Sequence, residues 1–441
     1  MSQLARRTLT WTGLYLLFSL VPLLLMLIGP LPDGRGFWIE LGVALGFLGL
    51  SMMAVQFALT ARFPKIGGPF GLDTMMHFHR QAGIVAFLFV LAHPVIIILA
   101  DNSYLVFFDP RENLPRAGAL SMVTVLLVLV VALPICRQAI SMPYEWWRLT
   151  HGLMASLVVI IGLGHVMMVG HYVDVWWKQG VWILVVGVAL LLFGITRVFK
   201  PWQLRRKPYR VEQVAAETSR VWSVHLRADG HEGMDFDAGQ FAWLNHRLTP
   251  MLFHEHPFTI SSSAETPAHI TLTIKELGDF TKTIGQTRPG ETFYLDGPYG
   301  MFRLDCAFAA SEIVLIAGGI GITPCLSMLR TMRDRHDTRP VMLVYANVTE
   351  SSIAFRGELD EMAGQMRLQI HHVIENPEGE WNGYQGRLTA RMLKEMLDGF
   401  TSRHTHYFIC GPEPMMDVAE RTLIEWGVHL EQRHAERFHI V

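Results

Sequence analysis

The chain has 441 residues, of which 51% are hydrophobic, a proportion high enough to suggest that part of it lies in a membrane. Its formal net charge of −2 at pH 7 gives no electrostatic basis for a nucleic-acid partner, and we exclude that class. The four cysteines form neither a Cys-x-x-Cys motif nor a close pair. This spacing argues against a disulfide scaffold, a zinc site or an iron–sulfur cluster held by this chain.

Six apolar stretches precede residue 200, and each is close to the roughly 20 residues that a helix needs to cross a bilayer. They cover about 11–29, 37–60, 81–100, 118–135, 152–169 and 180–198. A soluble helical core could imitate one such stretch, but six in succession predict a bundle of six transmembrane helices. We therefore expect a membrane domain over residues 1–204, surrounded by a lipid bilayer.

Basic residues are distributed unevenly among the connections between these stretches. If the N-terminus lies inside, the inner segments hold Arg6, Arg7, Arg62, Lys65, Arg80, Arg137 and Arg148, and the outer ones hold Arg35, Arg111, Arg116 and Lys178. Five more basic residues follow the sixth stretch, between positions 197 and 207. Basic residues favour the cytoplasmic side, which predicts a multi-pass protein of the cell membrane with both termini in the cytoplasm.

The second half of the sequence has the pattern of a soluble protein. Short β-rich runs separated by turns occupy about 209–304 and predict a small antiparallel barrel, to which we assign residues 205–307. From Ser311 onward, strands alternate with helices, as in a parallel sheet with crossover helices. This pattern defines a third domain over residues 308–441, cytoplasmic like the barrel.

Four histidines recur at matched spacing in the membrane domain. His79 and His93 belong to the third predicted helix and His151 and His165 to the fifth, and the members of each pair are 14 residues apart. That spacing separates them by roughly 21 Å along the axis and keeps them on one side of the helix. Two such helices face to face offer two histidine pairs, one near each leaflet, suited to haem iron with two axial imidazoles. The alternative, helix caps or interhelical hydrogen bonds, explains one histidine better than four.

Motifs suited to a flavin follow in the barrel. HPFTISS ends a predicted strand, KELGDFT leads into a predicted helix whose backbone amides would cradle a pyrophosphate, and GPYG forms a turn. The candidate FAD-binding residues are His256, Pro257, Phe258, Thr259, Ser261, Ser262, Lys275, Gly278, Phe280 and Thr281.

Two further motifs suit a nicotinamide nucleotide at the carboxyl edge of the parallel sheet, where ligands bind in such folds. The strand EIVLIAGG runs into a glycine turn, and CGPEPM follows the strand HYFI. The candidate residues are Gly318, Gly319, Gly321, Thr323, Pro324, Gly411, Pro412 and Glu413. Cys410 is either a catalytic neighbour of the nicotinamide or a buried structural cysteine, and the sequence leaves both interpretations open.

These motifs, in this order, resemble the ferric reductase and NADPH oxidase superfamily, in which a six-helix haem domain precedes a ferredoxin-reductase-type FAD and NAD(P) module. The resemblance implies two haem b groups, the inner one held by His79 with His151 and the outer one by His93 with His165. It also implies FAD contacts from residues 256–259, with Thr259 and Cys410 near the reacting rings. Phe438 resembles the aromatic residue that shields the flavin.

Two departures from the family pattern bear on the cofactors. His256 stands where soluble relatives have an arginine, which leaves the FAD pyrophosphate to Lys275, Thr281 and backbone amides. The strand that ends at Asn347 lacks an acidic residue for a ribose 2′-hydroxyl. Ser351, Ser352 and Arg356 could instead hold a 2′-phosphate, so the sequence favours NADPH over NADH.

The predicted activity is transfer of electrons from NAD(P)H through FAD and two haems to an acceptor outside the cytoplasm. A ferric chelate and dioxygen are equally acceptable acceptors, and the alternative is a membrane subunit that feeds a periplasmic protein partner. The outer loops, about 101–117 and 170–179, are short and favour a small acceptor.

Overall fold

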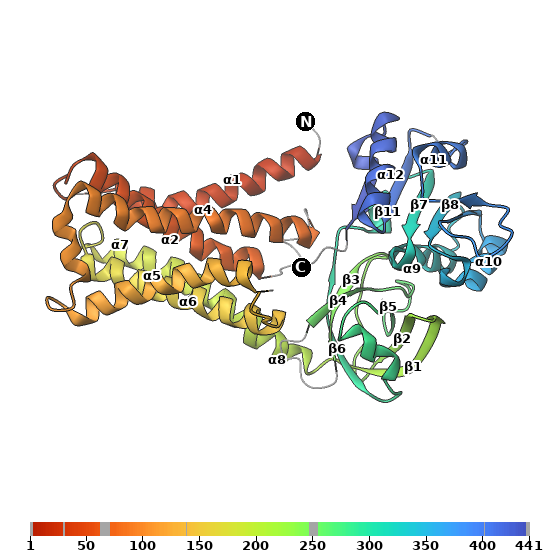
Figure 1. Ribbon diagram of the computed structural model, residues 1–441, viewed down its shortest axis with the longest axis horizontal. Helices are drawn as coiled ribbons and strands as arrows, with labels where there is room; N and C mark the ends of the chain where they lie inside the picture. Colours follow the sequence, from red (N-terminus) through yellow and green to blue (C-terminus); the bar gives the residue numbers. More distant parts are fainter. Residues whose placement is uncertain are drawn as a thin grey trace. The chain divides into compact units, whose positions relative to one another are not determined.

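The computed structural model describes residues 3–29, 31–61, 71–137, 139–246, 255–400 and 402–437 (Figure 1). The chain forms two compact units, Met1–Lys200 and Pro201–Val441. Phe438, one of the predicted catalytic residues, lies outside the described residues.

Long helices make up the first unit, and six of them, within the described residues, are long and apolar enough to cross a membrane (Figure 1). They are α1 (Gln3–Met26), α2 (Phe37–Thr60), α4 (Gly71–Ala100), α5 (Leu114–Cys136), α6 (Tyr144–Val169) and α7 (Trp176–Gly194). A π-helical turn, Ile195–Phe199, and the short α8, Lys200–Leu204, continue the last of them. The predicted six-helix bundle is therefore confirmed.

The surface of this bundle explains why the chain needs a bilayer. Half of the α2 span is buried inside the unit, but only 11 to 17% of each of the other five spans is buried. Large apolar side chains such as Leu99 and Ile135 are more than three-quarters exposed. Helices that are apolar all round are stable only where another apolar phase covers them, and lipid supplies that phase.

The second unit begins with a six-stranded antiparallel barrel whose strand order is β4-β3-β6-β1-β2-β5. Its strands are β1 (Pro208–Thr218), β2 (Val221–Ala228), β3 (Phe241–His246), β4 (Glu255–Thr259), β5 (His269–Lys275) and β6 (Thr292–Tyr299). A bridge between Ile260 and Leu272 joins the two outer strands and closes the barrel. Val224, Leu244 and Phe293 are among the fully buried residues that fill its interior.

A parallel six-stranded sheet with the order β10-β9-β8-β7-β11-β12 follows. Its strands are β7 (Glu312–Gly318), β8 (Val341–Asn347), β9 (Leu368–Ile374), β10 (Tyr384–Gln385), β11 (Thr405–Cys410) and β12 (Arg433–Glu436). The helices are α9 (Ile322–Asp334), α10 (Arg356–Gln365), α11 (Ala390–Met396) and α12 (Glu413–Glu425). The predicted fold class, a helical membrane bundle followed by an antiparallel barrel and a parallel α/β sheet, is confirmed.

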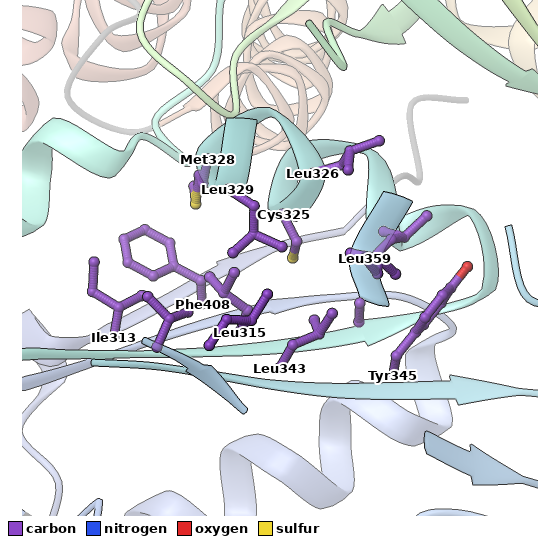
Figure 2. Close-up of a cluster of buried hydrophobic side chains, with 14 of the residues drawn as sticks. Ile313, Leu315, Cys325, Leu326, Met328, Leu329, Leu343, Tyr345, Leu359 and Phe408 are labelled. Atoms are coloured by element: carbon purple, nitrogen blue, oxygen red, sulfur yellow. The ribbon is translucent and has the colours of Figure 1, made fainter. Parts of the chain in front are cut away.

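The side chains of each central strand alternate between two hydrophobic layers. Ile313 and Leu315 point into the layer formed with α9 and α10, where Cys325, Leu329 and Leu359 also lie (Figure 2). The intervening residues, Val314 and Ile316, pack against α11 and α12 on the opposite face. Because both faces are covered, β7 is a continuous apolar run, as its sequence predicts.

The parallel sheet and the barrel are joined by polar side chains on α9. Ser327 Oγ donates to the Ser262 carbonyl (2.8 Å), and the Ala264 amide donates to Thr331 Oγ1 (2.9 Å). Arg330 donates to the Ser261 carbonyl (2.8 Å) and forms two 2.7 Å bonds with Glu358 of α10. These bonds fix the end of the HPFTISS segment against the helix that starts at the glycine turn.

Candidate functional site

The four predicted haem histidines form two facing pairs within the membrane unit. The rings of His79 on α4 and His151 on α6 have centroids 6.4 Å apart and planes at 79°. The rings of His93 and His165, on the same two helices, are 6.1 Å apart and at 70°. The fold thus brings together residues that are more than 70 positions apart in the sequence.

The distance between the rings fits one metal ion held between them. With a metal–imidazole bond of about 2.0 Å and a ring centre about 1.2 Å beyond the nitrogen, two axial imidazoles stand about 6.4 Å apart. Both observed centroid distances lie within a few tenths of an ångström of this value. The residues present therefore fit two bis-histidine haem irons, one for each pair.

In the barrel, aromatic rings bring the two flavin motifs together. His256 stacks on Phe280 with centroids 4.0 Å apart and planes at 14°. Phe258 lies against the same ring at 6.1 Å and 23°. Pro257 lies between these residues on β4, and Thr259 at the end of the strand is buried opposite Phe241 of β3. The two motifs form one apolar, aromatic surface suited to an isoalloxazine ring.

Two serines of the HPFTISS motif have a structural role instead of the predicted contact with FAD. Ser261 is fully buried, and its hydroxyl bonds to the Thr271 carbonyl (3.1 Å) and to Thr273 Oγ1 (2.8 Å). Ser262 Oγ accepts from the Thr271 amide at 3.1 Å. Both hydroxyls therefore hold the end of the HPFTISS segment to β5.

The pyrophosphate-binding helix predicted after Gly278 is a six-residue 3-10 helix, Thr281–Gln286. The amides of Leu277 and Gly278 both donate to Thr281 Oγ1, at 2.8 and 2.9 Å. The Thr281 hydroxyl and two amides expected to hold phosphate therefore bond to one another within the loop. Gly278 itself has open space around its Cα, which allows close approach of a ligand.

A pocket in the second unit joins the two nucleotide motifs at the carboxyl edge of the parallel sheet. Its lining residues are Lys275, Gly318, Gly319, Ile320, Gly321, Gly411, Pro412, Glu413, Met416 and Arg437. Lys275, which the sequence suggested for FAD, lines this pocket. Lys275 therefore lies at the predicted nucleotide site as well as at the end of a flavin motif.

Glycines allow the two loops of this pocket to touch. A Cβ on Gly321 would lie 2.2 Å from the Cys410 carbonyl oxygen, and one on Gly318 would lie 2.6 Å from Pro412 Cδ. A Cβ on Gly411 would likewise lie too close to Met415 Cε, at 2.6 Å. Thr323 and Pro324 are buried in the first turn of α9, where the Thr323 hydroxyl donates to the Ile320 carbonyl (3.0 Å). They shape the turn instead of facing a ligand.

Cys410 is fully buried in the hydrophobic layer that also holds Cys325. Burial raises the pKa of its thiol well above the usual value, and the nearby Glu436 carboxylate raises it further. The side chain does not line the pocket, which favours the structural interpretation over the catalytic one.

Two residues near the end of the chain belong to the site although sequence reasoning missed them. Glu436 is the register partner of Cys410 on β12, and its Oε1 lies 3.2 Å from the place where a Cβ on Gly300 would stand. It therefore lies between the GPYG turn of the barrel and the CGPEPM loop. Arg437 lines the pocket and pairs with Asp417 of α12 at 2.8 Å. β12 has only four residues, too few for a recognisable period.

Two of the three residues considered for a 2′-phosphate already make hydrogen bonds within the protein. Ser351 Oγ donates to Glu378 Oε1 (2.8 Å), and Ser352 Oγ donates to the Thr349 carbonyl (2.6 Å). Arg356 is exposed at the start of α10. The Glu378 carboxylate beside these hydroxyls weakens the case for a bound phosphate at this point.

These features define a class of protein, the multi-pass membrane NAD(P)H-dependent flavoprotein oxidoreductases. The features are six helices long enough to span a membrane, two facing histidine pairs, a barrel that carries the flavin motifs and a parallel sheet that carries the nucleotide motifs. The chain matches three families in order: "Ferric reductase like transmembrane component" over residues 45–162, "FAD-binding domain" over 208–302 and "Oxidoreductase NAD-binding domain" over 315–421. These three matches, in this order, correspond to the ferric reductase and NADPH oxidase superfamily, in which a ferredoxin-reductase-type module follows the membrane domain.

Similar proteins match the second unit. The glycine betaine monooxygenase reductase subunit of Pseudomonas aeruginosa is 29% identical over 245 residues, 54% of this chain and 65% of that protein. NADH-cytochrome b5 reductase 1 of Laccaria bicolor is 31% identical over 34% of this chain and 49% of its own length. The cytochrome b5 reductase domain of Ulva prolifera nitrate reductase is 21% identical, covers 53% of this chain and 97% of its own, and has a TM-score of 0.45. The chain thus spans less than two thirds of the length of these two curated relatives.

Proposed function

We propose that this protein passes electrons from cytoplasmic NAD(P)H, by way of FAD and two bis-histidine haem b groups, to a small acceptor on the far side of the cell membrane. The observation that carries the proposal is that two pairs of imidazole rings face each other on two membrane helices, with ring centroids 6.4 and 6.1 Å apart. An imidazole on each side leaves no open coordination position, which suits electron relay. Bound FAD would supply the conversion of a two-electron hydride into the single electrons that haem iron can take up.

The residues of the second unit supply binding and orientation. His256, Phe258 and Phe280 form an aromatic cluster against which the flavin could pack. Lys275 brings positive charge to the pocket, whereas Arg437 is paired with Glu413, Asp417 and Glu420. The glycines at 318 and 321 let the two pocket loops approach closely. Glu436, the register partner of Cys410, lies where the CGPEPM loop meets the GPYG turn of the barrel.

The acceptor side offers little room for a specialised substrate domain. Between α4 and α5 the chain forms a seven-residue 3-10 helix, Asn102–Phe108, and only a short turn separates α6 from α7. Short loops favour a small diffusing acceptor, either a ferric chelate or dioxygen, over a periplasmic protein partner. The positive-inside distribution supports placing these loops outside and the second unit in the cytoplasm.

The test uses purified, FAD-supplemented protein in nanodiscs, with NADH or NADPH added anaerobically while the haem Soret and α bands are followed. We expect two low-spin haems per chain, both reduced, and His79→Ala or His165→Ala variants that each retain one. Reoxidation by air with a superoxide-dismutase-sensitive signal identifies dioxygen as the acceptor, and reoxidation by ferric chelate alone identifies a ferric reductase. Absence of a haem spectrum from the wild-type protein would overturn the proposal.

A further inference from the structure

The ring of His93 lies against two glycines of the neighbouring helix, α2. Its Nδ1 is 2.9 Å from the Gly42 carbonyl oxygen. A Cβ on Gly46, one turn further along α2, would lie 2.8 Å from the same Nδ1 and 3.0 Å from Cγ. The imidazole thus occupies the space that any side chain at position 46 would need.

This contact fixes both the orientation and the tautomer of the imidazole. A carbonyl oxygen only accepts hydrogen bonds, so Nδ1 carries the proton and donates it to Gly42. In the neutral ring, Nε2 then keeps the free lone pair that a metal requires. A hydrogen bond of this kind to a ligand histidine holds the ring plane and increases the basicity of the other nitrogen.

The surrounding packing keeps α2 close to α4 at this depth. A Cβ on Gly42 would lie 2.8 Å from Ile97 Cγ1 and 3.2 Å from the His93 carbonyl, and one on Gly49 would lie 2.5 Å from Val90 Cγ2. Small residues at such spacing allow two membrane helices to approach closely. The inner pair differs, because His79 Nδ1 is buried without a hydrogen-bond partner among the described residues.

We propose that Gly42 and Gly46 of α2 together orient the His93 ring as a ligand of the outer haem. Gly42 acts through its carbonyl and Gly46 through its missing side chain, so both are positioning residues. This inference rests on the proposed function, because it assumes that His93 binds haem iron. It adds that α2, which carries none of the four ligands, determines whether the outer site forms.

The first test compares Gly46→Ala with Gly164→Ala by haem-to-protein ratio and by redox titration of the full chain. A Cβ on Gly164, next to His165 on α6, meets nothing within 4 Å, so this matched control should keep two haems. We expect the haem content of the Gly46→Ala variant to fall from two per chain to one, and its redox titration to lose one of the two waves. A Gly46→Ala protein with both haems and unchanged spectra overturns the inference and leaves the proposed function intact, whereas a haem-free wild type overturns both.

A second test remains informative if Gly46→Ala accumulates poorly. His93→Ala removes the ring that a Cβ at position 46 would strike, so the double variant should accommodate the methyl group. We expect Gly46→Ala to lower the melting temperature and yield in the wild-type background and to change neither in the His93→Ala background, a coupling that a double-mutant cycle measures. An equal penalty in both backgrounds would show that the methyl group does not act through His93, and the inference would be overturned.

Discussion

Cys325 on α9 and Cys410 on β11 lie in one buried layer, whereas Cys306 is exposed. Burial raises the pKa of the Cys325 thiol to about 12 and that of Cys410 well above its usual value. A thiol whose pKa is raised stays protonated as the pH increases, and the thiolate is the reactive form.

We therefore expect iodoacetamide to modify the exposed Cys306, while Cys410 and Cys325 react at least about tenfold more slowly between about pH 7 and 9. Peptide mass spectrometry of the native protein, with a denatured sample as the control, measures the three rates. If Cys410 reacted as fast as Cys306 and NAD(P)H protected it, the thiol would be part of the nicotinamide site, as the catalytic interpretation requires.

At the scale of single elements, α9 holds the nucleotide sheet to the barrel, mainly through Arg330. Its side chain is only 15% exposed, and it bonds to Glu358 and to the Ser261 carbonyl. Removal of one partner from such a pair leaves the other charge poorly solvated and costs about 3 kcal/mol.

Arg330→Met should lower the apparent temperature of FAD release by roughly 6 to 12 °C, the shift expected for that loss in a unit of this size. Flavin fluorescence during a thermal ramp of the full chain in detergent measures it. Arg391→Met is the matched control, because its pair with Glu395 is largely exposed and should leave the curve unchanged. Equal curves for the two variants would contradict the proposed role of Arg330.

Local elements were predictable to different extents. The long helices and the apolar strand β7 follow from hydrophobic runs, which burial or lipid enforces over many residues. The helix expected after Gly278 is present only as a six-residue 3-10 helix, Thr281–Gln286, and Thr281 accepts hydrogen bonds from the two preceding amides. A side chain that accepts hydrogen bonds from nearby backbone amides changes the local structure without any periodic pattern in the sequence.

At the scale of the whole molecule, the orientation in the membrane is open to direct measurement. Cys136 ends α5 and is exposed, and the proposed orientation places it in the cytoplasm. Ser103 is exposed in the loop between α4 and α5, which the same orientation places outside.

In a Cys306→Ser background, a membrane-impermeant maleimide should label Cys136 in inside-out vesicles and not in right-side-out vesicles. A Cys136→Ser, Ser103→Cys variant should give the reverse pattern. Mass-tag gel shifts measure both, and the opposite labelling of the two sites would place the second unit outside the cytoplasm.

The sequence by itself determined the class of this protein, its six spans, its two soluble folds and the four histidines at matched spacing. Hydrophobic runs and fixed motif order carry this information because bilayer thickness and helix pitch constrain residues close together in the chain. Only the tertiary structure decided where the side chains of the motifs lie. It bonded Ser261 to β5, brought Glu436 beside Gly300 and placed Gly46 under the His93 ring. Those contacts join distant segments through packing and hydrogen bonds that no local pattern encodes.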